Sequence, residues 1–230
     1  SKTLYLFTIP PISVVFMKYE ILYRPAYSVL KVDLDPGESI EAEAGALMMI
    51  EGDVEVKTKS RGLLRALTTG ESLFVNVYRA GGSPVTLWLS PPIPGDVMYV
   101  RLDGSKGVIV NDKCYLASHG DVRHRVVWRG LRGIFGGGGL MWLHFTGVGG
   151  VWVNAYGSIV EREVKPEERL TIDNVHLVAM DDGLEYDIRK FGSLKTLLFG
   201  GEGFVFSVRG MGKIYLQSRN PTIWYMRSKS

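Results

Sequence analysis

Cysteine is almost absent from this sequence of 230 residues. Cys114 is the single one, so no disulfide can form within the chain and no cysteine cage can hold a metal ion. A chain without internal disulfides is typical of a reducing compartment, which predicts a cytoplasmic location. Cys114 stands in the apolar stretch Lys113–Leu116, where a buried, inert thiol is expected rather than a nucleophile.

Long hydrophobic runs are also lacking. A helix that crosses a membrane needs about 20 apolar residues, whereas the stretch LYLFTIPPISVVF (Leu4–Phe16) is shorter and is interrupted by Pro10-Pro11. It could pass for the core of a signal peptide, but no small-residue cleavage site follows it. We therefore expect residues 1–16 to be an N-terminal extension or an added strand, with Met17 as the natural start.

The chain has no strong excess of one charge. Its 27 Lys and Arg residues against 24 Asp and Glu residues give a net charge of +3. Nucleic-acid binding requires a concentrated basic face, with exposed rings if bases are to stack on it. Rings and cations are neighbours at Trp128-Arg129 and at 224–227, but rings in strands more often belong to the core. Nucleic-acid binding is thus the least favoured of the alternatives.

Catalytic motifs are missing as well. The run Gly136–Gly139 could surround an anion, but it leads into the predicted strand Leu140–Phe145 without the lysine and helix of a P-loop. We interpret it as a flexible or bulged start of a hairpin. A nucleophile elbow, GxSxG, does not occur. The acid pairs Asp181-Asp182 and Glu167-Glu168 fall at predicted turns, where solvated acids are ordinary, so no catalytic set is expected.

The histidines show no metal-binding spacing. His119 and His124 would face opposite sides of a continuous strand. His119 and His176 fall in comparable parts of the repeat described next, but not at matching positions. A structural or surface role is expected for each histidine, and neither a metal nor a cofactor is implied. The four residues are His119, His124, His144 and His176.

Glycine, in contrast, is abundant, and it marks a repeated pattern. The 28 glycines fit a turn-rich β protein rather than a helical one. A basic apolar loop, a glycine-led strand, a turn and a second strand follow one another in Ser60–Leu89, Arg129–Val153 and Lys190–Leu216. Each copy is preceded by strands and a turn containing Gly and Asp. The repeat length is about 65 residues, which indicates a repeat architecture.

One such unit cannot bury its apolar face alone, whereas three packed together can. We predict an all-β fold, in which a single domain consists of three related β-sandwich or barrel units in a pseudo-threefold arrangement. Helix is expected only as single turns within the loops. The domain is predicted to cover residues 17–230, with approximate units at 19–97, 98–162 and 163–226.

The three loops share one composition, with cations spaced among large apolar residues. Equivalent positions on three repeats tend to lie at one end of a domain, so these side chains could share one surface. Such a surface suits an acidic membrane interface or an interface with a protein partner or a second copy. In the simplest alternative, the leucines fold back onto the core. The candidate binding residues are Arg61, Arg65, Arg129, Arg132, Lys190 and Lys195, and the candidate apolar contacts are Leu63, Leu64, Leu131, Ile134, Leu194 and Leu197.

Several blocks resemble those of one family, in the family's order. They are EAGALMMIEGDVEV, GESLFVNVYRA, SPPIPGDV, KCYLASHGDV, GVGGVWVNAYGSIVE, VHLVAM and GMGKIYLQSRNP. The family is that of altered-inheritance-of-mitochondria protein 24, and the resemblance covers about Met17 to Ser218. It implies a β fold likened to the tryptophan-RNA-binding attenuator protein (a TRAP-like fold), without implying its RNA-binding function. The mitochondrial relatives are associated with inner-membrane organisation, and no catalytic set is established. Gly138 departs from the family, which usually has an acidic residue there, as at Glu202.

Together, these observations predict a non-enzymatic binding or scaffold protein that contacts a membrane surface or a partner through the three loops. The expected location is cytoplasmic, peripheral to a membrane if the loops bind one. The competing hypothesis is a small-ligand-binding protein or enzyme with a pocket at the pseudo-axis. A homo-oligomer is among the expected partners.

Overall fold

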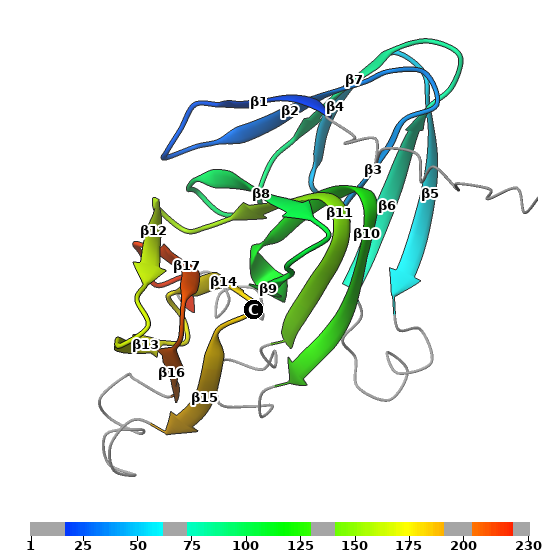
Figure 1. Cartoon of the computed structure of the whole chain (residues 1–230). Coiled ribbons are helices and arrows are strands. Elements are labelled where there is room, and N and C mark those ends of the chain that lie inside the picture. The colour runs from blue at the N-terminus through cyan, green and yellow to red at the C-terminus, as the bar shows by residue number, and fades with distance from the viewer. Residues whose placement is uncertain (1–16, 62–72, 130–140, 191–203, 223–230) are drawn as a thin grey trace, which may run out of the picture.

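The computed structural model describes residues 17–61, 73–129, 141–190 and 204–222. These residues fold into antiparallel sheets, and the predicted all-β, single-domain class is confirmed (Figure 1). The 3-10 turn η1 (Asp112–Cys114) is the one helical element bounded within them. No helix among the described residues has the length and hydrophobicity needed to cross a bilayer.

Most strands are short, but two in the middle of the chain, β10 and β11, are long. In chain order they are β1 (Lys18–Leu22), β2 (Val29–Leu34), β3 (Ser39–Glu43), β4 (Leu47–Glu51), β5 (Val54–Arg61), β6 (Leu73–Ala80), β7 (Val85–Leu89), β8 (Val97–Asp103), β9 (Val108–Asn111), β10 (Tyr115–Arg129), β11 (Met141–Asn154), β12 (Ile159–Val164), β13 (Arg169–Asp173), β14 (Leu177–Asp181), β15 (Glu185–Lys190), β16 (Phe204–Arg209) and β17 (Gly212–Gln217).

They form three sheets. A four-stranded sheet has the order β1-β2-β7-β4, and a three-stranded sheet has the order β13-β16-β15. Between them lies a ten-stranded sheet with the order β12-β17-β14-β9-β11-β10-β3-β6-β5, in which β8 also pairs with β11. Figure 1 shows the four-stranded sheet at one end of the molecule and the three-stranded sheet at the other.

One pattern of pairing occurs three times along the chain. In the first unit, β2 and β4 flank β7 while β3 and β5 flank β6. In the third unit, β12 and β14 flank β17 while β13 and β15 flank β16. In the second unit, β10 and β11 each correspond to two such strands run together, and β8 and β9 pair with successive parts of β11.

A β-bulge repeats with the pattern. The register shifts between Leu47 and Met49 in β4, between Tyr115 and Ala117 in β10, and between Leu177 and Ala179 in β14. This recurrence supports the predicted internal repeat. The third unit begins with β12, slightly before the predicted boundary at residue 163. The arrangement of the units about a threefold axis stays a prediction.

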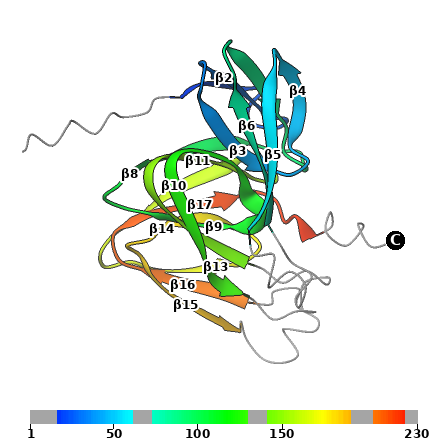
Figure 2. The same ribbon diagram turned by 90° about the vertical axis from the view of Figure 1, so that its right-hand side faces the viewer.

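Neighbouring units are joined strand to strand. At the first seam β10 pairs with β3, with Ala117 opposite Ala42. At the second seam β14 pairs with β9, with Ala179 opposite Val110. The β10–β11 hairpin therefore lies between the other two units, as Figure 2 shows from a second direction.

The hydrophobic core is divided in the same way. The cluster around Leu30 and Leu87 of the first unit also contains Trp152 of the second. The cluster around Trp142 of the second unit contains Phe206 of the third, with their ring centroids 5.0 Å apart. Because each cluster includes residues from a neighbouring unit, no unit completes its core alone.

Candidate functional site

The three loop-bearing hairpins end in the same way. Arg61 ends β5 opposite Leu73, Arg129 ends β10 opposite Met141, and Lys190 ends β15 opposite Phe204, so pairing continues to the last strand residue. The arrowheads of β5, β10 and β15 point toward one side of the molecule in Figures 1 and 2. The other candidate loop residues lie outside the described residues. These are Arg65, Arg132, Lys195, Leu63, Leu64, Leu131, Ile134, Leu194 and Leu197.

A groove accompanies each seam between units. The groove beside β3 and β10 has a volume of about 380 Å³ and is lined by Glu41, Lys59 and His119, among others. The groove beside β9 and β14 has a volume of about 410 Å³ and is lined by Asp181 and Lys213, among others. Both volumes are at the lower end of those of small-molecule sites.

The charges that line these grooves are largely satisfied within the protein. Lys59 Nζ lies 3.2 Å from Glu41 Oε1 in the first groove. In the second, Lys213 Nζ lies 2.6 Å from Glu161 Oε1, and Asp181 Oδ2 accepts a hydrogen bond from the Lys213 backbone N–H at 2.9 Å. The grooves therefore present alternating, paired charges rather than a convergent catalytic set.

His119 is a strongly perturbed base at the first seam. Its side chain is 3% exposed, and its ring packs against Tyr99 and Trp152. Nε2 lies 2.9 Å from the Tyr99 hydroxyl, whereas Nδ1 is buried without a hydrogen-bond partner. Burial lowers the pKa of His119 from 6.5 to about 4. The ring is therefore neutral near pH 7, which fits a structural role in the seam.

A His119→Gln variant tests this role through the pH dependence of stability. The folded-state pKa lies below the unfolded value, so the stabilisation from neutral His119 is complete above pH 6.5 and is lost as the pH falls toward 4. The loss amounts to about 3 kcal/mol at most, at 1.36 kcal/mol per pKa unit. We expect the midpoint of urea unfolding to fall less steeply over this window in the variant than in the wild type.

The comparison with the wild type is needed because a second group, Glu43, changes the stability with pH in the opposite direction to His119. Burial raises the pKa of Glu43 from 4.5 to about 7, with Lys113 lowering it and Asp112 raising it further. Protonated Glu43 stabilises the fold fully below pH 4.5, and this stabilisation is lost as the pH rises through 7. Parallel curves for the wild type and His119→Gln would show that His119 carries no such linkage.

The other histidines are held by neighbouring groups. His144 Nε2 lies 2.9 Å from Asp182 Oδ2, His176 Nδ1 lies 2.8 Å from the Gln217 carbonyl, and the His124 ring packs on Phe145. No group of three or more His, Cys, Asp or Glu within the described ranges could hold a metal ion.

The acid pairs singled out in the sequence also take part in turns. Asp182 bonds His144, and Asp181 accepts the backbone hydrogen bond from Lys213. Glu168 accepts hydrogen bonds from Arg162 and from the Lys165 backbone N–H, at 2.8 and 3.0 Å. Asp181, Asp182 and Glu168 therefore each have a structural partner.

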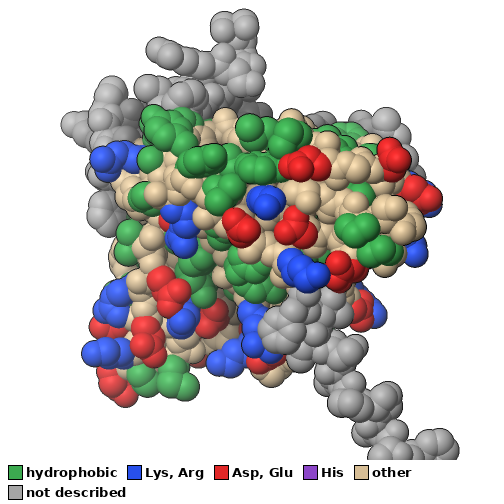
Figure 3. All heavy atoms as spheres, turned by 90° about the horizontal axis from the view of Figure 1, so that it is seen from above, with side chains coloured by type: hydrophobic (Ala, Val, Ile, Leu, Met, Phe, Trp, Pro, Cys, Tyr) green, Lys and Arg blue, Asp and Glu red, His purple; other side chains and the backbone are tan. Residues whose placement is uncertain are grey.

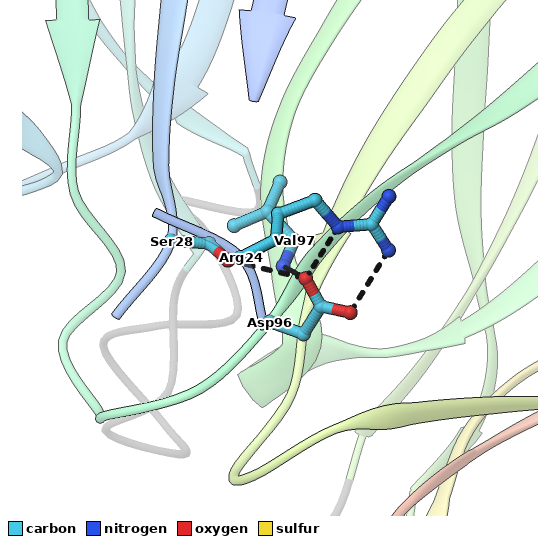
Figure 4. Close-up of polar contacts among 4 residues, drawn as sticks. All are labelled: Arg24, Ser28, Asp96 and Val97. Atoms are coloured by element: carbon cyan, nitrogen blue, oxygen red, sulfur yellow. Dashed lines mark hydrogen bonds and ion pairs between the residues drawn. The ribbon is translucent and has the colours of Figure 1, made fainter. Parts of the chain in front are cut away.

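An ion pair that the sequence reasoning missed fixes the junction between the first two units (Figure 4). Asp96 is 2% exposed and accepts two hydrogen bonds from the Arg24 guanidinium, at 2.8 and 2.9 Å. It also accepts from Ser28 Oγ at 3.1 Å and from the Val97 backbone N–H at 2.9 Å. Burial alone raises the pKa of Asp96, but Arg24, Val97 and Ser28 outweigh it and hold the pKa below 3.8.

The family model described as mitochondrial biogenesis AIM24 matches residues 19–219, which include all three units. The chain belongs to the AIM24 family. An uncharacterized protein of Streptococcus pyogenes serotype M6 is 30% identical over 217 residues, covering 89% of this chain and 86% of that protein. The crystal structure of another Streptococcus pyogenes protein is similar, with a TM-score of 0.78 and 29% identity over 93% of this chain and 99% of that one. The resemblance to this family is confirmed.

In this AIM24-family chain, the single thiol lies in the core. Cys114 is 1% exposed at the end of η1, and burial raises its pKa, with Asp112 and Glu43 adding to the shift. The thiolate, which is the nucleophilic form, is therefore strongly disfavoured. Glu43 is a titratable group that sequence reasoning passed over, because the charged residues that act on its pKa, Lys113 and Asp112, are distant in the sequence.

Proposed function

We propose that this AIM24-family protein is a non-enzymatic binding or scaffold protein that contacts a membrane surface or a protein partner through its three basic apolar loops. The observation that carries the proposal is the common direction of β5, β10 and β15, which lead into these loops from equivalent hairpins (Figures 1 and 2). Each of these strands ends on a cation, namely Arg61, Arg129 or Lys190.

The chemistry of the loops suits an anionic, partly apolar surface. Leucine and isoleucine side chains can enter the acyl boundary of a bilayer while cations meet the lipid phosphates. Each cation near an acidic leaflet contributes about 1 kcal/mol, and salt screens this attraction. A protein partner would use the same groups, since arginine and large apolar residues are enriched in interface cores. Binding to vesicles that requires acidic lipid and weakens at high salt would indicate the membrane surface rather than the protein partner.

Co-sedimentation with liposomes tests the proposal. We expect the protein to bind acidic vesicles and not neutral ones, with binding that decreases at high salt. A variant carrying Arg61, Arg65, Arg129 and Arg132→Glu should lose this binding, because four cations contribute about 4 kcal/mol in total.

A charge-matched control distinguishes an effect of the loops on binding from an effect of the net charge of the protein. Four exposed cations outside the loops, Lys106, Arg123, Lys165 and Arg219, can be changed to Glu with the same change in total charge. This control should still bind acidic vesicles. Equal loss of vesicle binding in both variants would show a nonspecific charge effect. If the wild type does not bind vesicles even at low salt, a membrane surface is excluded and a protein partner is the remaining binding target.

A further inference from the structure

Several strands end a sheet and have one partner among the described residues, and two of them, β4 and β13, lie at opposite ends of the molecule. β4 pairs with β7 and ends the four-stranded sheet, and β13 pairs with β16 and ends the three-stranded sheet. Figure 1 shows them far apart, β4 in the upper part of the molecule and β13 in the lower part. An unpaired edge exposes a row of backbone donors and acceptors to which another strand can be added.

The repeat shows what normally covers these edges. β4 corresponds to the first part of β10 and to β14, because all three carry the same bulge and pair with the equivalent strand of their own unit. β13 corresponds likewise to β3 and β9. At the two seams within the chain, β10 pairs with β3 and β14 pairs with β9. The edges of β4 and β13 are thus the two halves of a third seam.

Side-chain exposure at β4 agrees with a missing partner. Ala117 and Ala179, the first paired residues after the bulge in the second and third units, are 0% exposed within the seams. Met49, at the equivalent position, is 42% exposed, and its neighbours Leu47 and Met48 are 37% and 62% exposed. Figure 3 views this end of the molecule and shows hydrophobic side chains gathered among the charged ones. An exposed apolar edge strand of this kind favours pairing with another chain.

We propose that copies of this protein associate head to tail, with β4 of one copy pairing antiparallel with β13 of the next. The two internal seams supply the register. Ala117 lies opposite Ala42 and Ala179 lies opposite Val110, so Met49 lies opposite Ile172 of the next copy and Ile50 opposite Thr171. Such an interface joins two different surfaces, so it generates a closed ring or an open filament. The proposal uses the strand edges and does not depend on the loops.

Sedimentation velocity over a range of concentrations tests the association. We expect the wild type to form species larger than the monomer, and Met49→Lys to weaken the association by at least about tenfold, because a charge on an edge opposes strand pairing. Met211→Lys is the matched control, since Met211 is 68% exposed in the turn between β16 and β17. A wild type that stays monomeric at all concentrations would overturn the proposal, as would Met49→Lys associating like the wild type.

Cross-linking tests the register independently of any effect on folding. One sample carries Ile50→Cys, a second carries Thr171→Cys, and a third is their mixture, each treated with a short bis-maleimide. Native Cys114 is buried, so only the introduced thiols react. We expect covalent dimers in the mixture and not in the separate samples, and this arrangement excludes pairing within one chain. Dimers in the separate samples to the same extent, or no dimers in any sample, would overturn the head-to-tail seam.

Discussion

A Gly95→Ala variant is expected to lose more than about 4 kcal/mol of stability, which for a domain of ordinary stability leaves little folded protein. Gly95 lies where the segment joining the first and second units runs beside the one joining the second and third, with Gly95 and Gly157 forming a parallel bridge. A Cβ atom at this position would lie 1.8 Å from the Ala155 carbonyl oxygen, and 2.7 and 2.8 Å from the Gly157 backbone N and O. All three are backbone atoms, so no side chain can rotate away to relieve the overlap.

The surrounding hydrogen bonds prevent the two segments from separating. Gly157 N–H donates to the Pro94 carbonyl at 3.1 Å, and Asp96 N–H donates to the Gly157 carbonyl at 2.8 Å. The Gly95 carbonyl accepts from Ser28 N–H at 2.9 Å, which ties the first unit to the same bridge. Moving the chain to admit a methyl group would break several of these bonds, each of which contributes about 1 kcal/mol.

Urea unfolding followed by circular dichroism measures the effect. Gly81→Ala is the control, because no atom lies within 4 Å of the Cβ position there and the change tests only the intrinsic preference for alanine. We expect the control to differ from the wild type by less than about 1 kcal/mol. If Gly95→Ala unfolds at the same urea concentration as the wild type, the two segments do not pack as closely as described.

The sequence was sufficient to predict the all-β class and the repeated hairpins, because glycine turns and alternating apolar residues act over a few residues. Gly52-Asp53 and Asp182-Gly183, for example, lie at matching turns before β5 and β15, whereas the turn expected at Gly120-Asp121 is wrong, because both residues lie inside β10. The fusion of two strands into β10 was not predictable from this pattern, since it depends on β11 continuing through Gly147 and Gly149 as its partner.

The features of the candidate site likewise divide into those that the sequence could predict and those that it could not. The cations of the three loops could be identified from composition, and Arg61, Arg129 and Lys190 stand at equivalent hairpin ends. Long-range partners could not be identified. Arg24 and Asp96 are 72 residues apart, and neither has a local sequence context that indicates a buried ion pair. The free edges of β4 and β13 become visible only when the seams between the other strands are known.

An Asp96→Ala variant is expected to lose about 3 kcal/mol of stability at neutral pH, at the lower end of the range for breaking a buried ion pair. The value is at that end because the Arg24 side chain is 48% exposed and can regain water once its partner is removed. The Ser28 hydroxyl and the Val97 N–H remain enclosed and lose their acceptor, at about 1–3 kcal/mol for each unsatisfied group that does not rearrange. Asp121→Ala is the control, since the Asp121 side chain is 77% exposed and its ion pair with Arg123 lies at the surface. That change is expected to cost less than about 0.5 kcal/mol.

Comparing the wild type with an Asp96→Asn variant over a range of pH separates the contribution of the Asp96 charge to stability from that of its side-chain shape. Because the folded-state pKa is held below 3.8, the ionised carboxylate stabilises the fold fully above that value, and this contribution is lost as the pH falls through the lower, folded-state pKa. The difference in free energy of unfolding between the wild type and Asp96→Asn should therefore be constant from pH 7 down to about 4 and shrink below it. Urea unfolding of both proteins in this acidic range gives the comparison. A difference that stays the same down to the acid limit of folding would mean that packing around residue 96, and not the charge paired with Arg24, holds the junction together.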